Sequence, residues 1–160
     1  MLYNLSMVLP ILATKLYIPP PPAKAVARSR LIKQLTEGLA TGSKLTLISA
    51  PAGFGKSTLV SEWVINSGRP VAWLSLDEND NGPARFLIYM IGALQTISPD
   101  LGAGLIDAVQ SPQTPSIDSI LTALLNEIAN IPNNFILVLD DYHLTDSTSV
   151  DDVLVFLIEH

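Results

Sequence analysis

The chain has 160 residues, of which 48% are hydrophobic, so it is long enough for one compact domain with a real core. Its net charge of -6 excludes a broad basic face for a nucleic-acid backbone, and we expect no direct DNA binding. The chain has no cysteine and two histidines, which excludes a disulfide framework, a thiolate zinc site and a haem attachment motif.

The chain opens with an apolar, uncharged stretch that ends before Lys15. This stretch is too short to span a bilayer and lacks the basic front of an export signal, so we expect a strand or a packing arm and no membrane association. A cleaved signal peptide and an over-long start, with Met7 as a second initiator, are the alternatives. Residues 19–22 are consecutive prolines, which form a stiff spacer. We therefore expect an arm and spacer over 1–22 and a folded domain over 23–160.

Apolar residues recur at helical spacing in five later segments. The helices expected from this spacing cover residues 29–39, 56–66, 83–97, 117–128 and 149–158. Short apolar runs predict three buried strands, over residues 45–49, 71–76 and 135–139. Residues 98–115 contain prolines and glycines and are expected to form a loose connection. Strands that alternate with helices predict an α/β domain with a parallel sheet.

The segment APAGFGKS, from Ala50 to Ser57, has the spacing of a phosphate-binding P-loop, with alanine in place of the usual first glycine. Gly53 and Gly55 let the backbone turn its N–H groups toward phosphate oxygens, and the following helix adds its positive end. Lys56 would neutralise the β- and γ-phosphates, and the Ser57 hydroxyl would bind magnesium. The nucleotide-binding set expected here is Ala52, Gly53, Phe54, Gly55, Lys56, Ser57 and Thr58.

Asp140 and Asp141 follow the last predicted strand, where a carboxylate can orient a magnesium ion through its water shell. We expect Asp140 to serve the metal together with Ser57, and Asp141 to orient or deprotonate an attacking water. A plain strand end with two solvated acids is the alternative for both residues, and it weighs more heavily for Asp141.

Other polar and aromatic residues carry weaker signals. Arg28 and Arg30 precede the first predicted helix, where they would border a nucleotide base or cap that helix. His143 is expected to be a packing or capping residue near the site. Trp63 and Trp73 lie among aliphatic neighbours and are expected in the core. The acids after the second strand are expected to be ordinary turn residues; these are Asp77, Glu78 and Asp80.

With these motifs placed, the chain resembles the nucleotide-binding domain of the MalT-like, large ATP-dependent LuxR-type transcriptional regulators, a branch of the STAND ATPases. The resemblance runs from about Leu12 to His160 and includes the segments LATKLYIPPP, SRLIKQL, LTLISAPAGFGKSTLVSEW, RPVAWLSLDENDNGPARFL and NFILVLDDYHL. It implies a P-loop NTPase fold, with three α/β/α layers and a mainly parallel sheet, truncated after the Walker B strand and one further helix.

The resemblance also implies function. The P-loop residues from Gly53 to Thr58 match the family's phosphate-binding segment, Asp140 and Asp141 match its magnesium and hydrolysis segment, and the two arginines match a basic stretch more weakly. ATP and Mg2+ are the implied cofactors. The implied protein is a cytoplasmic switch with at most slow hydrolysis, and its DNA-binding part lies in a further C-terminal region. We also consider self-association.

Two other functions stay open. One is a small P-loop phosphotransferase or ATPase, which would need a substrate lid with several arginines, whereas no arginine follows Arg85. The other is a non-functional gene fragment.

In related P-loop ATPases, the strand after the magnesium-binding strand inserts between that strand and the P-loop strand, and this chain lacks the inserted strand. The strands over 45–49 and 135–139 would then pair directly or leave a gap, and we expect a marginal or aggregation-prone domain when the chain is expressed alone.

Overall fold

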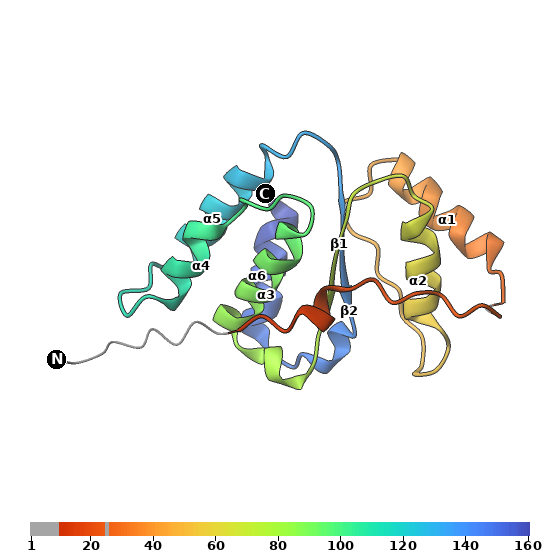
Figure 1. The fold of residues 1–160 in the computed structure, drawn as a ribbon, viewed down its shortest axis with the longest axis horizontal. Helices are drawn as coiled ribbons and strands as arrows, with labels where there is room; N and C mark the ends of the chain where they lie inside the picture. Colours follow the sequence, from red (N-terminus) through yellow and green to blue (C-terminus); the bar gives the residue numbers. More distant parts are fainter. Residues whose placement is uncertain (1–9, 25) are drawn as a thin grey trace.

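The structure is a computed structural model that describes residues 10–24 and 26–160. Over these residues the chain forms α-helices, short 3-10 helices and two strands (Figure 1). In chain order the elements are η1 (Ala13–Leu16), α1 (Ser29–Ala40), α2 (Lys56–Ile65), β1 (Val71–Ser75), η2 (Glu78–Asn81), α3 (Pro83–Gln95), α4 (Ala103–Gln110), α5 (Ile117–Ile128), β2 (Ile136–Asp140), η3 (Tyr142–Leu144) and α6 (Thr148–Glu159).

The two strands form a small parallel sheet at the centre of the molecule. Their register pairs Val71 with Ile136 and Ser75 with Asp140, so both carboxyl ends lie at one edge. Helices α3, α4, α5 and α6 lie on one side of the strands, and α1 and α2 lie on the other (Figure 1). The mixed helix and strand content with parallel strands agrees with the predicted α/β class.

The core divides between the two sides of β1 because successive side chains of a strand point to opposite faces. Ala72 and Leu74 belong to the larger cluster, which α3 dominates with a nearly continuous buried surface. Trp73 points the other way and packs with Trp63 and Val64 of α2 in the smaller cluster. The prediction that both tryptophans are core residues is confirmed.

Each of the five predicted helices is present, with ends that differ by one or two residues. The expectation of a loose connection over 98–115 is wrong in part, because this segment contains the helix α4. Gly102 precedes α4 with a φ of 67°, and its N–H donates to the Glu127 carboxylate at 2.6 Å. A Cβ on Gly102 would stand 2.6 Å from Ile91 Cγ2, so the turn into α4 requires a glycine for both backbone and space.

The strand predicted over 45–49 does not form. This segment is extended but enters no ladder, and the side chains of Leu45 and Leu47 are 62% and 81% exposed. A cavity of about 580 Å³, lined by residues 46–52 and 138–143, separates it from β2. The second of the two expected outcomes, a gap, is therefore the one observed. For the same reason β2 is half-buried along its whole length and not buried on both faces, as had been predicted.

The packed structure also begins earlier than the prolines suggest. Lys15 of η1 is 7% exposed, and Ile11 and Leu16 pack on the larger core cluster. Ile18 packs on the smaller cluster. The expectation that the core starts after residue 22 is wrong in this respect, while the division into 1–22 and 23–160 stays a prediction. The strand, signal-peptide and start-site alternatives fall mainly on residues 1–9, outside the described residues.

Within the described ranges, the helices are all too short or too polar to cross a bilayer.

Candidate nucleotide site

The glycines of the P-loop segment take the backbone conformation that the motif requires. Gly53 and Gly55 have φ values of 80° and 73°, in the left-handed region that side chains disfavour. Helix α2 begins immediately afterwards at Lys56, with Gly55 as its N-cap. The loop thus ends at the positive end of a helix, which is a favourable place for an anion.

The Lys56 side chain folds back onto the loop that precedes it in sequence. Its ammonium donates to the carbonyl oxygens of Ala50, at 2.7 Å, and Pro51, at 3.3 Å. These carbonyls are contacts that the sequence did not reveal, because a backbone acceptor carries no signature in the residue type. They keep a positive charge beside the glycines.

The loop and the end of β2 meet through one hydrogen bond. The Ser57 hydroxyl donates to Asp140 Oδ1 at 2.9 Å, although the two residues are separated by 83 positions in sequence. The Asp141 N–H donates to the same oxygen at 3.1 Å. The predicted metal pair, Ser57 and Asp140, is therefore side by side in the structure.

The environment of Asp140 disfavours its negative charge. Burial raises the pKa of the carboxyl, and the neighbouring Asp141 carboxylate raises it further, while the Ser57 hydrogen bond and the Lys56 charge oppose the rise. Because the net shift is upward, a cation placed beside Asp140 would relieve an unfavourable charge. The site has the electrostatics of a cation-binding carboxylate.

Asp141 occupies a special backbone position. Its φ of 56° makes it the residue with left-handed backbone among the described non-glycine residues, a conformation that aspartate tolerates better than most. Its carboxylate lies 4.0 Å from His143 Nδ1. The His143 side chain is 60% exposed, so the expectation of a packing residue is wrong, while His143 does lie near the site and in the last turn of η3, where a capping role stays a prediction. Both groups face solvent at the carboxyl edge of the sheet.

Of the two arginines, Arg28 lies at the loop. Its Nη2 is 3.1 Å from the place where a Cβ on Gly55 would stand, so the guanidinium rests on the glycine backbone. Arg28 makes no side-chain cap to α1, and Arg30 is exposed on that helix. The structure therefore separates two residues that the sequence treated alike.

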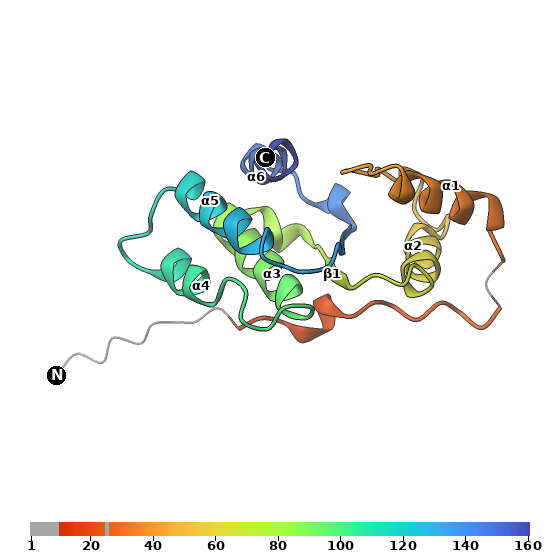
Figure 2. The ribbon, with the colours of Figure 1, turned by 90° about the horizontal axis from the view of Figure 1, so that it is seen from above.

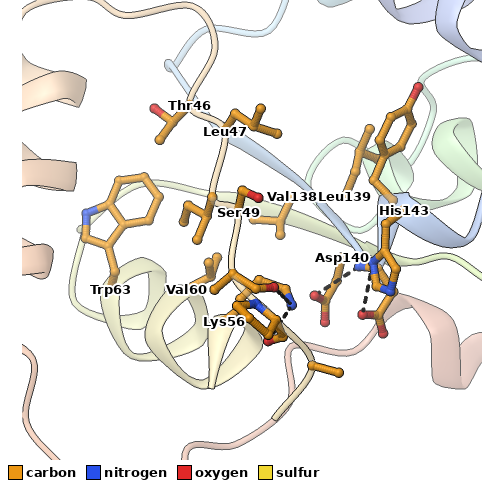
Figure 3. Close-up of a pocket in the computed structure, with 16 residues that line it drawn as sticks. Thr46, Leu47, Ser49, Lys56, Val60, Trp63, Val138, Leu139, Asp140 and His143 are labelled. Atoms are coloured by element: carbon orange, nitrogen blue, oxygen red, sulfur yellow. Dashed lines mark hydrogen bonds and ion pairs between the residues drawn. The ribbon is translucent and has the colours of Figure 1, made fainter. Parts of the chain in front are cut away.

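Two cavities flank the segment that leads into the loop. The first, which lies between this segment and β2, reaches Lys56, Asp140 and Asp141; in Figure 3 Thr46, Leu47 and Ser49 line one side of it and Val138 and Leu139 the other. The second, of about 620 Å³, lies toward α1 and includes Arg28 and Phe54. Lys56 lines both, so the loop has open space on either side.

The remaining predicted residues are placed as follows. Ala52, Gly53 and Phe54 are exposed at the tip of the loop, and Thr58 is half-buried in the first turn of α2. In the described part of the chain, no group of three or more histidine, cysteine, aspartate or glutamate side chains is arranged to hold a metal ion. Two adjacent oxygen donors, Ser57 and Asp140, still suit Mg2+, which binds few protein ligands and keeps several waters.

One hydrogen bond near the site was not foreseen. The Tyr142 hydroxyl donates to the Asp151 carboxylate, which ties η3 to α6. Burial and this negative neighbour raise the pKa of the Tyr142 phenol to about 12. The contact holds the loop that follows Asp141 from its far side.

Comparison with known proteins gives relatives over most of the chain. It is 37% identical over 135 residues, 84% of the chain, to the HTH-type transcriptional regulator MalT of Klebsiella pneumoniae subsp. pneumoniae and of Cronobacter sakazakii. It is 32% identical over 150 residues, 94% of the chain, to MalT of Yersinia pestis. The chain spans 15% to 16% of the length of these relatives. No protein-family model matches it.

Proposed function

We propose that this chain, which belongs to the family of MalT-like transcriptional regulators, is the ATP-binding part of such a regulator. The observation that carries the proposal is the hydrogen bond between Ser57 and Asp140, which joins the predicted phosphate loop to the predicted magnesium carboxylate. It sits beside Lys56 and two glycines with left-handed backbone. Loop, ammonium, hydroxyl and carboxylate are the groups that a Mg–ATP site needs.

Each group has a distinct part in the proposed binding. The backbone N–H groups of the loop and the start of α2 hold the phosphates, and Lys56 exchanges its carbonyl contacts at Ala50 and Pro51 for phosphate oxygens. Ser57 and Asp140 hold Mg2+, which supplies positive charge to the phosphates when bound. Arg28 adds a second cation beside Gly55.

Hydrolysis, in this proposal, is slow. Asp141 is the candidate to orient a water molecule, but its side chain is shorter than that of a glutamate and is partly exposed. We therefore expect nucleotide binding to matter more than hydrolysis. Nucleotide binding would then act as a switch that favours one arrangement of the longer regulator, in the cytoplasm, with DNA bound by another region.

The test is a titration of the chain with a fluorescent ATP analogue in the presence of Mg2+. Lys56→Met should weaken binding by about 10- to 100-fold, because it removes a charged hydrogen-bond donor to the phosphates. Lys33→Met is the matched control, as Lys33 is exposed on α1 and pairs with Glu37 in the same helix. Equal binding by the parent and Lys56→Met would refute the assignment of the loop.

Two further comparisons separate the parts of the site. Asp140→Ala should weaken binding when Mg2+ is present and leave it nearly unchanged in chelator, since its proposed role acts through the ion. Arg28→Gln should weaken binding more than Arg30→Gln, because only Arg28 rests on the loop. Loss of equal size in chelator would contradict the metal role of Asp140.

A further inference from the structure

The N-terminal segment makes a buried ionic cluster that the proposed nucleotide site does not use. Lys15 Nζ lies 2.5 Å from Asp80 Oδ2 and 2.8 Å from Asp77 Oδ2. The Asp80 side chain is 0% exposed and also accepts from Arg85 Nε at 3.1 Å. Both cations lie over the ring of Tyr89, with 4.8 Å from Lys15 Nζ and 5.2 Å from the Arg85 guanidinium carbon to the centroid. Two cations and two carboxylates thus balance one another, with Lys15 and Asp80 buried and with Asp77 and Arg85 partly exposed.

The titration behaviour agrees with this pairing. Burial alone lowers the pKa of Lys15, but its hydrogen bonds to Asp77 and Asp80 outweigh burial, and the pKa is raised above its ordinary value. The Lys15 hydrogen bond in turn lowers the pKa of Asp77. Asp80, which sequence analysis treated as an ordinary turn residue, is therefore the buried centre of the cluster, and that expectation is corrected.

The cluster fixes the turn that follows β1. The Asp77 N–H donates to Asp80 Oδ2 at 2.9 Å, and the Asn79 N–H donates to Asp77 Oδ1 at 2.8 Å. These bonds form a capping box around η2, in which the Asp80 oxygen that binds Lys15 also holds the start of the turn. Removing the ammonium would leave Asp80 with Arg85 and one backbone donor.

The turn is joined to the loop after β2. Asn81, the last residue of η2, accepts a hydrogen bond from the Asp146 N–H at 2.7 Å. Asp146 lies in the same short loop as Asp141, between β2 and α6. Ion pairs at Lys15, the backbone of η2 and the hydrogen bond at Asn81 therefore connect the N-terminal segment to the loop at the candidate site.

The residues around Lys15 hold the N-terminal segment in place by apolar contacts and one hydrogen bond. Ile11 lies against Gly92 of α3, where a Cβ would stand 2.8 Å from Ile11 Cδ1. The Leu12 N–H donates to the Tyr89 hydroxyl at 3.2 Å, and Ile18 packs on the cluster that contains Trp63. Figure 2 shows the segment passing along one side of the molecule, from α3 past β1 to α2.

We propose that residues 11–18 form a strap across the two sides of the sheet, and that Lys15 is a positioning residue whose ion pairs hold the turn after β1 and, through Asn81, the loop that carries Asp141. The strap itself does not depend on nucleotide binding. Its consequence for Asp141 rests on the proposed function, because only a nucleotide site gives that carboxylate a role.

The test is hydrogen exchange, residue by residue, on the full chain without nucleotide. In Lys15→Met, the Asp146 amide and the amides of residues 77–81 should exchange about tenfold faster or more, while amides of β1 and β2 change much less. Lys24→Met is the control, because Lys24 is exposed and lies beyond the strap. A uniform rise that includes the strands, or no change at Asp146, would show that the cluster only stabilises the fold and would overturn the proposal.

A second variant interrupts the path at its other end and leaves the buried cluster intact. Asn81→Ala should speed exchange across residues 141–147 without a rise at residues 11–18. Unchanged exchange in that loop would overturn the proposal even where Lys15→Met fails to fold. Nucleotide affinity is measured separately, on the parent chain and on Lys56→Met. Equal affinity of these two proteins would refute the nucleotide site and would leave the exchange result for the strap standing.

Discussion

Replacement of Asp140 by asparagine is expected to stabilise the chain, although it removes a group on which the proposed site depends. The amide keeps an oxygen that can accept from the Ser57 hydroxyl and the Asp141 N–H, so neither donor is left unpaired. The variant removes a half-buried negative charge that lies beside Asp141, with Lys56 as its only partial compensation among the charges that shift its pKa. The raised pKa of Asp140 means that the folded protein disfavours the charged form of this carboxyl relative to water.

The expected gain follows from opposing contributions. Two charge-assisted hydrogen bonds become ordinary ones, which costs about 1 to 2 kcal/mol in total. Relief of the desolvated charge exceeds this cost, since the balance of these same effects gives the upward pKa shift. Because Asp140 is only half-buried, solvent screening keeps the net stabilisation below about 1 kcal/mol, so the urea midpoint should rise by at most roughly 0.5 M for a domain of this size.

The pH dependence gives a second check on the same reasoning. A carboxyl with a raised folded pKa contributes stability below its unfolded value, here the ordinary 3.8, and loses it as the pH rises through the folded value. The advantage of Asp140→Asn should therefore be present at neutral pH and disappear as the pH falls toward 3.8. Urea unfolding of the parent, Asp140→Asn and the exposed control Asp107→Asn measures this difference.

The refuting result is an Asp140→Asn variant that is no more stable than the parent at neutral pH, with the control unchanged. That outcome would mean that the Ser57 and Asp141 hydrogen bonds outweigh the buried charge. The same samples should show loss of the Mg2+-dependent part of nucleotide affinity.

Three further predictions concern the fold and the loop after β2. Gly102→Ala should destabilise the chain by about 2 to 4 kcal/mol in urea, from a left-handed φ and a steric clash, whereas Gly104→Ala, with nothing near its Cβ, should be neutral or stabilising by about 0.5 to 1 kcal/mol. Tyr142→Phe should lower the free energy of unfolding by about 1 kcal/mol at neutral pH. Because the pKa of Tyr142 is raised to about 12, the parent should lose this contribution as the pH rises from about 10 through about 12, whereas the variant should not. In ultraviolet titration, the variant should have one tyrosine fewer that titrates near the upper value. Leu47→Ser should change the free energy of unfolding by less than about 0.5 kcal/mol and improve solubility, whereas Leu74→Ser in β1 should destabilise by about 3 kcal/mol or more.

The sequence predicted the elements whose signal is local. The five expected helices have apolar residues at helical spacing, and β1 and β2 have compact apolar runs, so their existence followed from period and propensity. The glycines at 53 and 55 are likewise local, because left-handed backbone is what glycine permits. Placement of Ser57 beside Asp140 was expected because each motif follows a predicted strand, and the two residues do meet although the strand over 45–49 does not form.

Other features depended on neighbours that a local pattern does not specify. Residues 45–49 have the composition of a strand, but a strand needs an adjacent ladder, and none reaches this segment. The burial of Asp80 depends on Lys15, which lies 65 residues away, and nothing in the turn itself announces that partner. Helix α4 was missed because prolines and glycines on either side outweighed three apolar residues at helical spacing.

The separation of 83 residues between Ser57 and Asp140 also bears on the order in which the protein takes shape. A ribosome releases the glycine loop and α2 well before β2 exists, so the emerging polypeptide carries an unfinished site while the 83 positions from Ser57 to Asp140 are added. Closing so long a loop is entropically costly and comes late. Under the proposed function, competence to hold nucleotide would then arise in one step once β2 has emerged, and termination before Asp140 would leave none of it.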